Sequence, residues 1–306
     1  MSNRSRSRLL HPDLATLTTD YEAFRSSAGA VELPRDFVRA AGPDVITFLQ
    51  GQLSQNVAVL GAGASTWALL LQPQGKVVAF LRILRVGEEE VVLETDAGFG
   101  PAVIERLNRF KMRVKCDLDP LAWTCVAVRG PRAHELVEGG VVADWPGLPG
   151  ADLVGPSVVL PHGIAWCSLE AYEAVRIEAG IPIMGRELDE GTIPAEAGVV
   201  DMSVSFTKGC YTGQELVARI DSRGGNVPRR LRGVILGDGA SPPAGAAVSA
   251  EGKEAGRLTS VAFSPRLGST VALAYVRRSV DPPAEVTVDW DGGTSPARVE
   301  ALPLVP

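Results

Sequence analysis

Residues that bind metals or act as nucleophiles are scarce in this chain. Its 306 residues include four cysteines and three histidines. None of the cysteines belongs to a C-x-x-C pair or to a Cys/His pair at zinc spacing. The sequence therefore predicts no internal metal site. Scattered cysteines of this kind also fit reduced thiols in the cytoplasm better than a secreted disulfide framework.

The signals of several common function classes are also missing. A formal net charge of −6 argues against a nucleic-acid partner, for which a basic excess is expected. The basic N-terminus lacks the apolar stretch of a signal peptide, and no apolar run approaches the roughly 20 residues that span a bilayer. There is no G-x-S-x-G elbow and no glycine-rich nucleotide loop. We expect a cytoplasmic protein without a membrane or nucleic-acid partner.

The first part of the chain has the pattern of a mixed α+β fold. Two apolar strands at residues 67–71 and 77–86 flank a turn and predict a hairpin. A strand, a Gly-Pro pair and a helix follow one another both at Gly42 and at Gly130. This repetition has two explanations, an internal duplication or chance, because Gly-Pro before a helix is common.

After residues 226–232 the pattern changes to strands only. The short strands are separated by Gly, Pro, Asp and Ser, as in a small barrel or sandwich. Four of them are expected, at residues 231–236, 256–261, 270–275 and 285–290. We therefore predict an α+β region over residues 1–228 and a β domain over residues 229–306.

The stretch from Phe206 to Leu216 combines a cation, a thiol, two glycines and the start of a helix. Thr212 and Glu215 have the spacing of a capping box, which predicts Thr212 as the N-cap and Glu215 reaching back to it. Cys210 would then lie just outside a helix N-terminus, close to Lys208. Both neighbours favour a thiolate and lower the pKa of the thiol. We expect Lys208 and Cys210 to point outward and to form the chemical centre of the motif.

Each candidate residue has an alternative without chemistry. Cys210 can be a small buried residue at a turn, the usual fate of a free cysteine. Glu178 lies near a helix C-terminus, where the helix dipole disfavours a carboxylate, which hints at a functional role. It can equally be a surface charge in an ion pair. Arg229 belongs to a short basic cluster that is either a solvated linker or a contact for an acidic ligand. The other three cysteines are expected in the core: Cys116, Cys125 and Cys167.

With these residues in view, the chain resembles the YgfZ branch of the GcvT-like folate-binding superfamily. The residues from Lys208 to Glu215 match the K-G-C-Y-x-G-Q-E motif of that branch at every fixed position. Further support comes from segments spread along nearly the whole chain: residues 48–52, Gly75-Lys76, residues 176–180, 256–260 and 274–276.

The resemblance implies a fold and a cofactor. The expected fold is a ring of two interlocked α+β lobes and a C-terminal β-barrel, with tetrahydrofolate or a one-carbon derivative in a central channel. It implies that Glu178 contacts the pterin, since a carboxylate can accept hydrogen bonds from the amino and ring N–H groups. It also places the remaining folate contacts on the motif and the basic cluster: Lys208, Tyr211, Gln214 and Arg229.

Two departures from the aminomethyltransferases of this superfamily bear on function. Those enzymes keep a catalytic aspartate just after the hairpin turn, where this chain has Ala79 and Phe80. Neither side chain can ionise, so aminomethyl transfer is placed in doubt. An arginine of the transferases in the helix-opening motif is replaced here by Gln214.

Three functions remain as alternatives. The first, which YgfZ-like proteins suggest, is a folate-binding accessory protein for assembly or repair of iron–sulfur clusters in client enzymes, with Cys210 and Lys208 as functional groups. The second is a folate-dependent one-carbon transferase or demethylase that works without the aspartate. The third is an interaction module that has lost the ligand.

Overall fold

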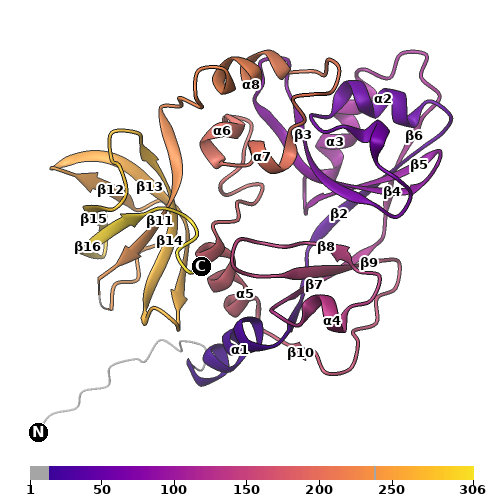
Figure 1. The fold of residues 1–306 in the computed structure, drawn as a ribbon. Helices are drawn as coiled ribbons and strands as arrows, with labels where there is room; N and C mark the ends of the chain where they lie inside the picture. The colour runs from indigo at the N-terminus through magenta and orange to yellow at the C-terminus, as the bar shows by residue number, and fades with distance from the viewer. Residues whose placement is uncertain (1–13, 238) are drawn as a thin grey trace, which may run out of the picture.

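The computed structural model describes residues 14–237 and 239–306, which form three bodies (Figure 1). Two are α+β lobes, each built on a five-stranded sheet, and the third is a closed six-stranded barrel. The predicted mixed α+β fold with a C-terminal barrel is thereby confirmed. In the described part of the chain, no helix is long and apolar enough to cross a membrane.

The first lobe contains a sheet with the strand order β3-β4-β5-β2-β6. Its buried face packs on two helices and a short 3-10 turn in one apolar cluster. The predicted hairpin is confirmed as the antiparallel pair β3 and β4. The elements of this lobe are β2 (Arg35–Ala41), α2 (Val45–Gln52), η1 (Val57–Val59), β3 (Ser65–Leu71), β4 (Val77–Gly87), β5 (Glu90–Asp96), α3 (Gly100–Asn108) and β6 (Asp117–Leu121).

The second lobe contains a sheet with the order β10-β1-β7-β9-β8. Strand β1 precedes the whole first lobe in sequence but pairs with β7, which follows that lobe, so the chain interlocks the two lobes. Helices α1 and α5 pack against each other beside this sheet. The elements are α1 (Leu14–Ser26), β1 (Gly29–Leu33), β7 (Thr124–Arg129), α4 (Ala133–Leu136), β8 (Val141–Val142), β9 (Gly150–Gly155), β10 (Ala165–Trp166) and α5 (Leu169–Ala179).

The two Gly-Pro segments adopt matching backbone conformations. Gly42 follows β2 with φ +137°, and Gly130 follows β7 with φ +132°. A Cβ atom would lie 2.4 Å from the carbonyl oxygen of Lys115 at the first position, and equally close to that of Ser27 at the second. Glycine is therefore required twice for the same reason, a left-handed turn pressed against backbone. This likeness favours duplication over chance.

Three short helices connect the lobes to the barrel: α6 (Pro194–Ala197), α7 (Val200–Ser203) and α8 (Gln214–Asp221). The barrel closes in the order β11-β14-β13-β12-β15-β16. Two of its strands were not predicted, β12 and β16, because they are short or polar. Its strands are β11 (Arg229–Leu236), β12 (Ala247–Ala250), β13 (Lys253–Ser264), β14 (Ser269–Arg277), β15 (Ala284–Trp290) and β16 (Gly293–Glu300).

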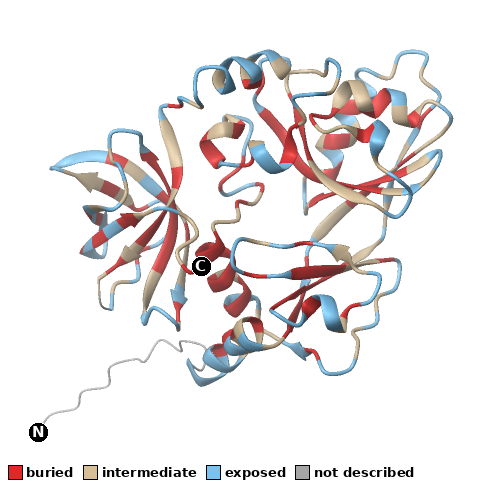
Figure 2. Cartoon of the chain, viewed as in Figure 1, coloured by how far each residue is buried: buried red, intermediate tan, exposed pale blue. Residues whose placement is uncertain are grey.

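Buried residues alternate along the barrel strands β15 and β16, whereas they run continuously through β14 and through the central strands of the lobes (Figure 2). A separate apolar cluster joins all three bodies, combining β4 of the first lobe, α5, the helices after it and the barrel strands β11 and β14. The bodies are thus fixed to one another by shared core, which allows side chains from different bodies to form one site.

Candidate functional site

Lys208 lies in the loop between α7 and α8 and points inward. Its ammonium nitrogen donates to three backbone carbonyls, those of Gln50 and Leu53 at 2.6 Å and that of Gln55 at 3.0 Å. These carbonyls lie at and just beyond the C-terminal end of α2, where the last carbonyls of a helix lack partners and the dipole favours a cation. The expectation that Lys208 points outward was wrong. It caps α2 from a distant part of the chain.

Lys208 is half-buried in this position. Burial lowers the pKa of Lys208 to about 8. The aromatic ring of Tyr211 stands 5.1 Å from the nitrogen, which adds a cation–π contact. At neutral pH the Lys208 side chain is still mostly charged. Its hydrogen bonds to the three carbonyls attach the motif to the end of α2.

The backbone of the motif is also hydrogen-bonded to the end of α2 and the residues just after it. Thr212 N donates to the carbonyl of Gly51 at 3.2 Å, and Ser205 N donates to that of Ser54 at 3.0 Å. Cys210 lies between these two attachment points, and its thiol is exposed. A cysteine held in this way presents its sulfur to solvent from a fixed loop. The reading of Cys210 as a small buried residue is therefore excluded.

The start of α8 differs from the predicted capping box. The N-cap is Gly213, with φ +86°, and within this described segment no side chain caps the helix. Gln214 Oε1 instead accepts from the backbone N–H of Tyr211 at 3.0 Å. Thr212 is one residue too early to be the N-cap, and the prediction for Thr212 and Glu215 was wrong.

Close packing of two glycines determines where α8 begins. A Cβ on Gly213 would lie 2.5 Å from the carbonyl oxygen of Gln72, in the turn between β3 and β4. The reverse contact is as tight, since a Cβ on Gly75 would lie 2.6 Å from the Cβ of Leu216. The hairpin turn of the first lobe and the first turn of α8 therefore interlock through two glycines in left-handed conformation.

Glu178 lies far from this motif, at the C-terminal end of α5. Its carboxylate is fully buried and accepts from Tyr21 Oη, at 3.0 Å to Oε1 and 2.9 Å to Oε2. Arg25 donates to Oε2, and Ser264 of the barrel donates to Oε1. Figure 1 places α1, which carries Tyr21 and Arg25, at the opposite end of the view from α8. The surface-ion-pair alternative for Glu178 is excluded.

The partners of Glu178 were missed by sequence reasoning because α1 itself was not predicted. Only its buried face marks it, with Leu17, Tyr21 and Phe24 at spacings of three and four residues. Arg25 follows Tyr21 by one helical turn on the same face. That spacing was the available signal, although nothing local to α1 points to a carboxylate 153 residues away.

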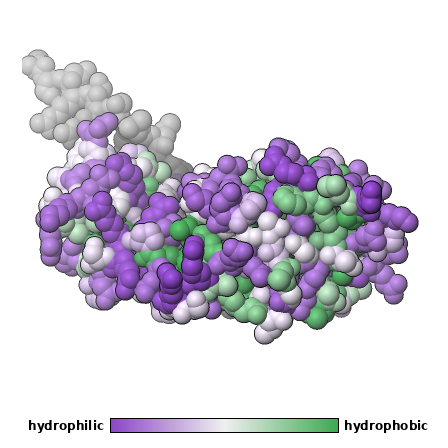
Figure 3. Space-filling model, turned by 90° about the horizontal axis from the view of Figure 1, so that it is seen from above, coloured by the Kyte–Doolittle hydropathy of each residue, from purple (hydrophilic) through white to green (hydrophobic). Residues whose placement is uncertain are grey.

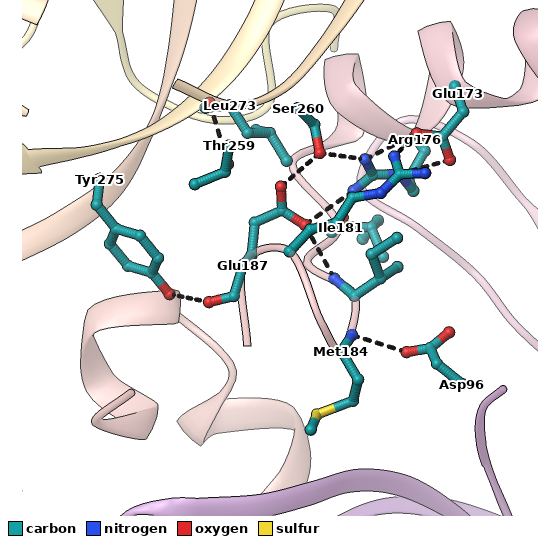
Figure 4. Close-up of polar contacts among 12 residues, drawn as sticks. Asp96, Glu173, Arg176, Ile181, Met184, Glu187, Thr259, Ser260, Leu273 and Tyr275 are labelled. Carbon is teal, nitrogen blue, oxygen red and sulfur yellow. Dashed lines mark hydrogen bonds and ion pairs between the residues drawn. The ribbon is translucent and has the colours of Figure 1, made fainter. Parts of the chain in front are cut away.

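A second buried network fixes the segment after α5 (Figure 4). Glu187 accepts from Ser260 Oγ at 2.6 Å and from Arg176 at 3.3 Å. Its backbone carbonyl accepts from Tyr275 Oη at 2.7 Å. These bonds tie the segment to the barrel and leave Met184 facing the first lobe.

Met184 contacts Phe80, one of the two positions where the catalytic aspartate was expected. Its backbone N–H donates to Asp96 at 2.9 Å, and its sulfur accepts from the N–H of Phe80 at 3.3 Å. Ala79 and Phe80 are both buried, and the Phe80 ring stacks on Trp67 at 4.7 Å between centroids. This position is therefore filled by apolar core.

The basic cluster does not form one patch. Arg229 donates to Glu196 at 3.0 Å and stands 4.4 Å from the centre of the Tyr275 ring. The neighbouring Arg230 donates to the carbonyl of Gly225 at 2.6 Å. Arg229 thus joins the barrel to α6, in a third location apart from both Lys208 and Glu178.

Among the residues that the structure describes, one group of potential metal ligands lies in the seam between the lobes. Ligand atoms of Glu94, Cys125 and Asp152 lie within 4.8 Å of one another. Arg82 pairs with both carboxylates, at 2.5 Å to Glu94 and 2.9 Å to Asp152. Burial, together with these carboxylates, raises the pKa of Cys125 well above its ordinary value. A guanidinium between the carboxylates and a protonated thiol make this an ion-pair network that joins the lobes.

Comparison with known proteins identifies the family. The GCVT N-terminal domain matches residues 14–146, and the glycine cleavage T-protein C-terminal barrel domain matches residues 229–306. The chain belongs to the GcvT-like superfamily. The finer YgfZ assignment is taken up below as part of a proposal.

Several relatives span most of the chain. An aminomethyltransferase of Streptomyces avermitilis is 27% identical over 93% of this chain and 88% of its own length. One from Thermus thermophilus is 27% identical over 97% and 93%. The crystal structure of the glycine cleavage aminomethyltransferase T from Bartonella henselae superposes with a TM-score of 0.81, at 22% identity, over 94% of this chain and 89% of that one. This last likeness supports the fold.

Proposed function

We propose that this chain is a tetrahydrofolate-binding accessory protein of the YgfZ type, which supports assembly or repair of iron–sulfur clusters in client enzymes of the cytoplasm. The observation that carries the proposal is the thiol of Cys210. It is exposed on a loop that Lys208 fixes to α2, whereas Cys116 and Cys125 are buried. A thiol presented in this way can contact a cluster or a persulfide on a partner.

The residues present fit a folate. Glu178 is an acceptor-only carboxylate in a buried site, and one N–H group of the Arg25 guanidinium is now bound to it. The 2-amino-pyrimidinone edge of a pterin offers donors of the same kind. Glu178 would hold that edge, and bound tetrahydrofolate would supply a one-carbon carrier. The parts proposed for Tyr211, Gln214 and Arg229 in folate binding stay predictions, as does that of Glu178.

Lys208 has a different part in this proposal from the one the sequence suggested. Its three hydrogen bonds to carbonyls at and just beyond the end of α2 leave it as the group that positions the Cys210 loop. A contact between Lys208 and an acidic folate tail would require these bonds to break.

Two measurements test the proposal. Calorimetry should detect tetrahydrofolate binding to the wild type and a large loss in Glu178→Gln, which keeps the size of the side chain. In a strain that lacks this protein, the wild-type gene should restore the activities of iron–sulfur enzymes. Cys210→Ser should fail to restore them, and Cys167→Ser serves as the matched control. Full restoration by Cys210→Ser would refute the role of the thiol.

The second candidate is a folate-dependent one-carbon transferase or demethylase, which the names of the relatives favour. Against it stand Ala79 and the stacked Phe80 at the expected aspartate position. Turnover of methylated or aminomethylated donors by the purified protein would decide for it. If no folate binds at high micromolar concentration, both folate functions fail and an interaction module remains.

A further inference from the structure

Three donors converge on the buried carboxylate of Glu178. Ser264 donates to Oε1 and Arg25 donates to Oε2, and the one hydroxyl proton of Tyr21 is shared between the two oxygens, at 3.0 Å from Oε1 and 2.9 Å from Oε2. Two carboxylate oxygens offer about four acceptor positions. A ligand with two parallel donors can therefore bind only after some of the present donors leave.

Arg25 is the donor best placed to leave. Ser264 also accepts from the N–H of Leu267, which holds it in the barrel. Tyr21 is fully buried in the apolar face of α1. Arg25 is the penultimate residue of that helix, and 8% of its side chain is already exposed. A change of its rotamer carries the guanidinium into water, where it keeps its charge and regains hydration.

The Arg25 guanidinium and a pterin present the same chemistry to the carboxylate. Arg25 directs one N–H donor, on Nη2, at Oε2, while its Nε donates to Tyr21 Oη at 3.3 Å. The amino and ring N–H groups of a 2-amino-pyrimidinone are N–H donors as well, two of them side by side. Each can satisfy the same buried oxygens, and the two cannot do so at once.

We propose that Arg25 is an intramolecular occupant of the pterin anchor, and that a pterin binds Glu178 only in exchange for it. This inference rests on the proposed function, because it assumes that Glu178 is the anchor. Arg25 then sets the affinity for folate, since only the fraction of molecules with Arg25 swung out is competent to bind. It also keeps the buried carboxylate paired when no folate is present.

Calorimetric titration of tetrahydrofolate into wild type, Arg25→Met and Tyr21→Phe tests the exchange. Arg25→Met keeps the apolar length of the side chain but offers no donor, and we expect it to bind at least about tenfold more tightly, as when fewer than about a tenth of wild-type molecules are competent. Tyr21→Phe removes a hydroxyl that accepts from Arg25 Nε at 3.3 Å and that also donates to Glu178. Because Arg25 keeps its bond to the carboxylate in this variant, binding should tighten by less, and the Arg25 signal described below shows whether Arg25 leaves. This variant keeps the test available if Arg25→Met does not fold.

The matched control is Arg129→Met. Arg129 is also buried and paired, with Asp152 at 2.6 Å, but has no contact with Glu178. It should leave the affinity unchanged, which separates release of the anchor from general loosening of the fold. A second readout is the NMR signal of the Arg25 Nε–H group, identified by its loss in Arg25→Met. It should move to the position of a freely rotating guanidinium when folate is added to the wild type.

The outcomes separate the two proposals. Binding by Arg25→Met that equals or falls below that of the wild type, with an unmoved Arg25 signal, would overturn the exchange and leave folate binding intact. If Arg25→Met bound tetrahydrofolate and the wild type did not, the exchange would be strongly supported. Absence of binding in all variants would overturn both the proposed function and this inference.

Discussion

Replacement of Lys208 by methionine tests whether this side chain is an internal clamp or a ligand-binding cation. Methionine keeps most of the apolar length but cannot donate to the three carbonyls that end α2. Leu53 is fully buried, whereas Gln50 and Gln55 are half exposed and their carbonyls can accept from water instead. The main loss is therefore one buried carbonyl without a partner.

The expected loss of stability is that of one buried carbonyl without a hydrogen-bond partner. A buried polar group left without its partner costs about 1–3 kcal/mol. Part of this is returned, because the variant no longer holds an ammonium group partly out of water. We expect Lys208→Met to lower the free energy of unfolding by about 1–2 kcal/mol. The assay is urea denaturation, with Lys253→Met in the barrel as a control that should change little because Lys253 is exposed.

Hydrogen–deuterium exchange locates the effect. Faster exchange should be confined to residues 50–56 and to the loop at 205–213, which the ammonium group joins. If Lys208→Met matched the wild type in both stability and local exchange but bound folate more weakly, the clamp would be refuted. Lys208 would then be the outward cation that its sequence context suggested.

Three further predictions follow from the same geometry. Burial lowers the pKa of Lys208 to about 8 in the folded chain, below its ordinary 10.5, so the unfolded chain binds more protons between these two pH values. The stability of the wild type relative to Lys208→Met should therefore rise as the pH increases from about 8 to 10.5. A fall in relative stability would show that the hydrogen bonds to the carbonyls favour the protonated amine by more than burial disfavours it. Gly130→Ala should destabilise the fold by about 3 kcal/mol, because φ is +132° and the new Cβ would lie 2.4 Å from a carbonyl oxygen. The control Gly61→Ala has open space around the new Cβ and should be close to neutral, so equal urea midpoints for the two variants would contradict the prediction. Phe80→Asp should destabilise by about 3–5 kcal/mol, because it removes the stack on Trp67 and buries a carboxylate, and it should not create aminomethyl transfer in a turnover assay.

Sequence reasoning succeeded where local patterns decide the structure. The hairpin β3–β4 was predicted from two apolar strands around a turn. Glu178 was placed near a helix C-terminus, and α5 does end one residue later, with Gly180 at φ +77° as its C-cap. In both cases the residues that specify the element are neighbours in the chain, so no tertiary contact was needed to recognise them.

It failed where a distant contact overrides a local preference. Thr212 has the residue type and spacing of an N-cap, yet the helix begins later, because Gly213 is pressed against the turn before β4. Lys208 points inward because the end of α2, more than 150 residues earlier, offers unpaired carbonyls. The partners of Glu178 come from α1 and the barrel, and neither pairing has a signal in the local sequence.

Two positions to which the family resemblance assigns a role are filled by the chain itself, but in different ways. At the expected aspartate position, Phe80 is 4% exposed and stacked, so nothing short of repacking the core can open it. At Glu178 the occupant is Arg25, a charged group near a helix end whose side chain is 8% exposed. The first filling leaves no ionisable side chain at that position, whereas under the proposed exchange the second would make ligand binding conditional. Under the same proposal the protein would respond to folate, with Cys210 as its exposed thiol.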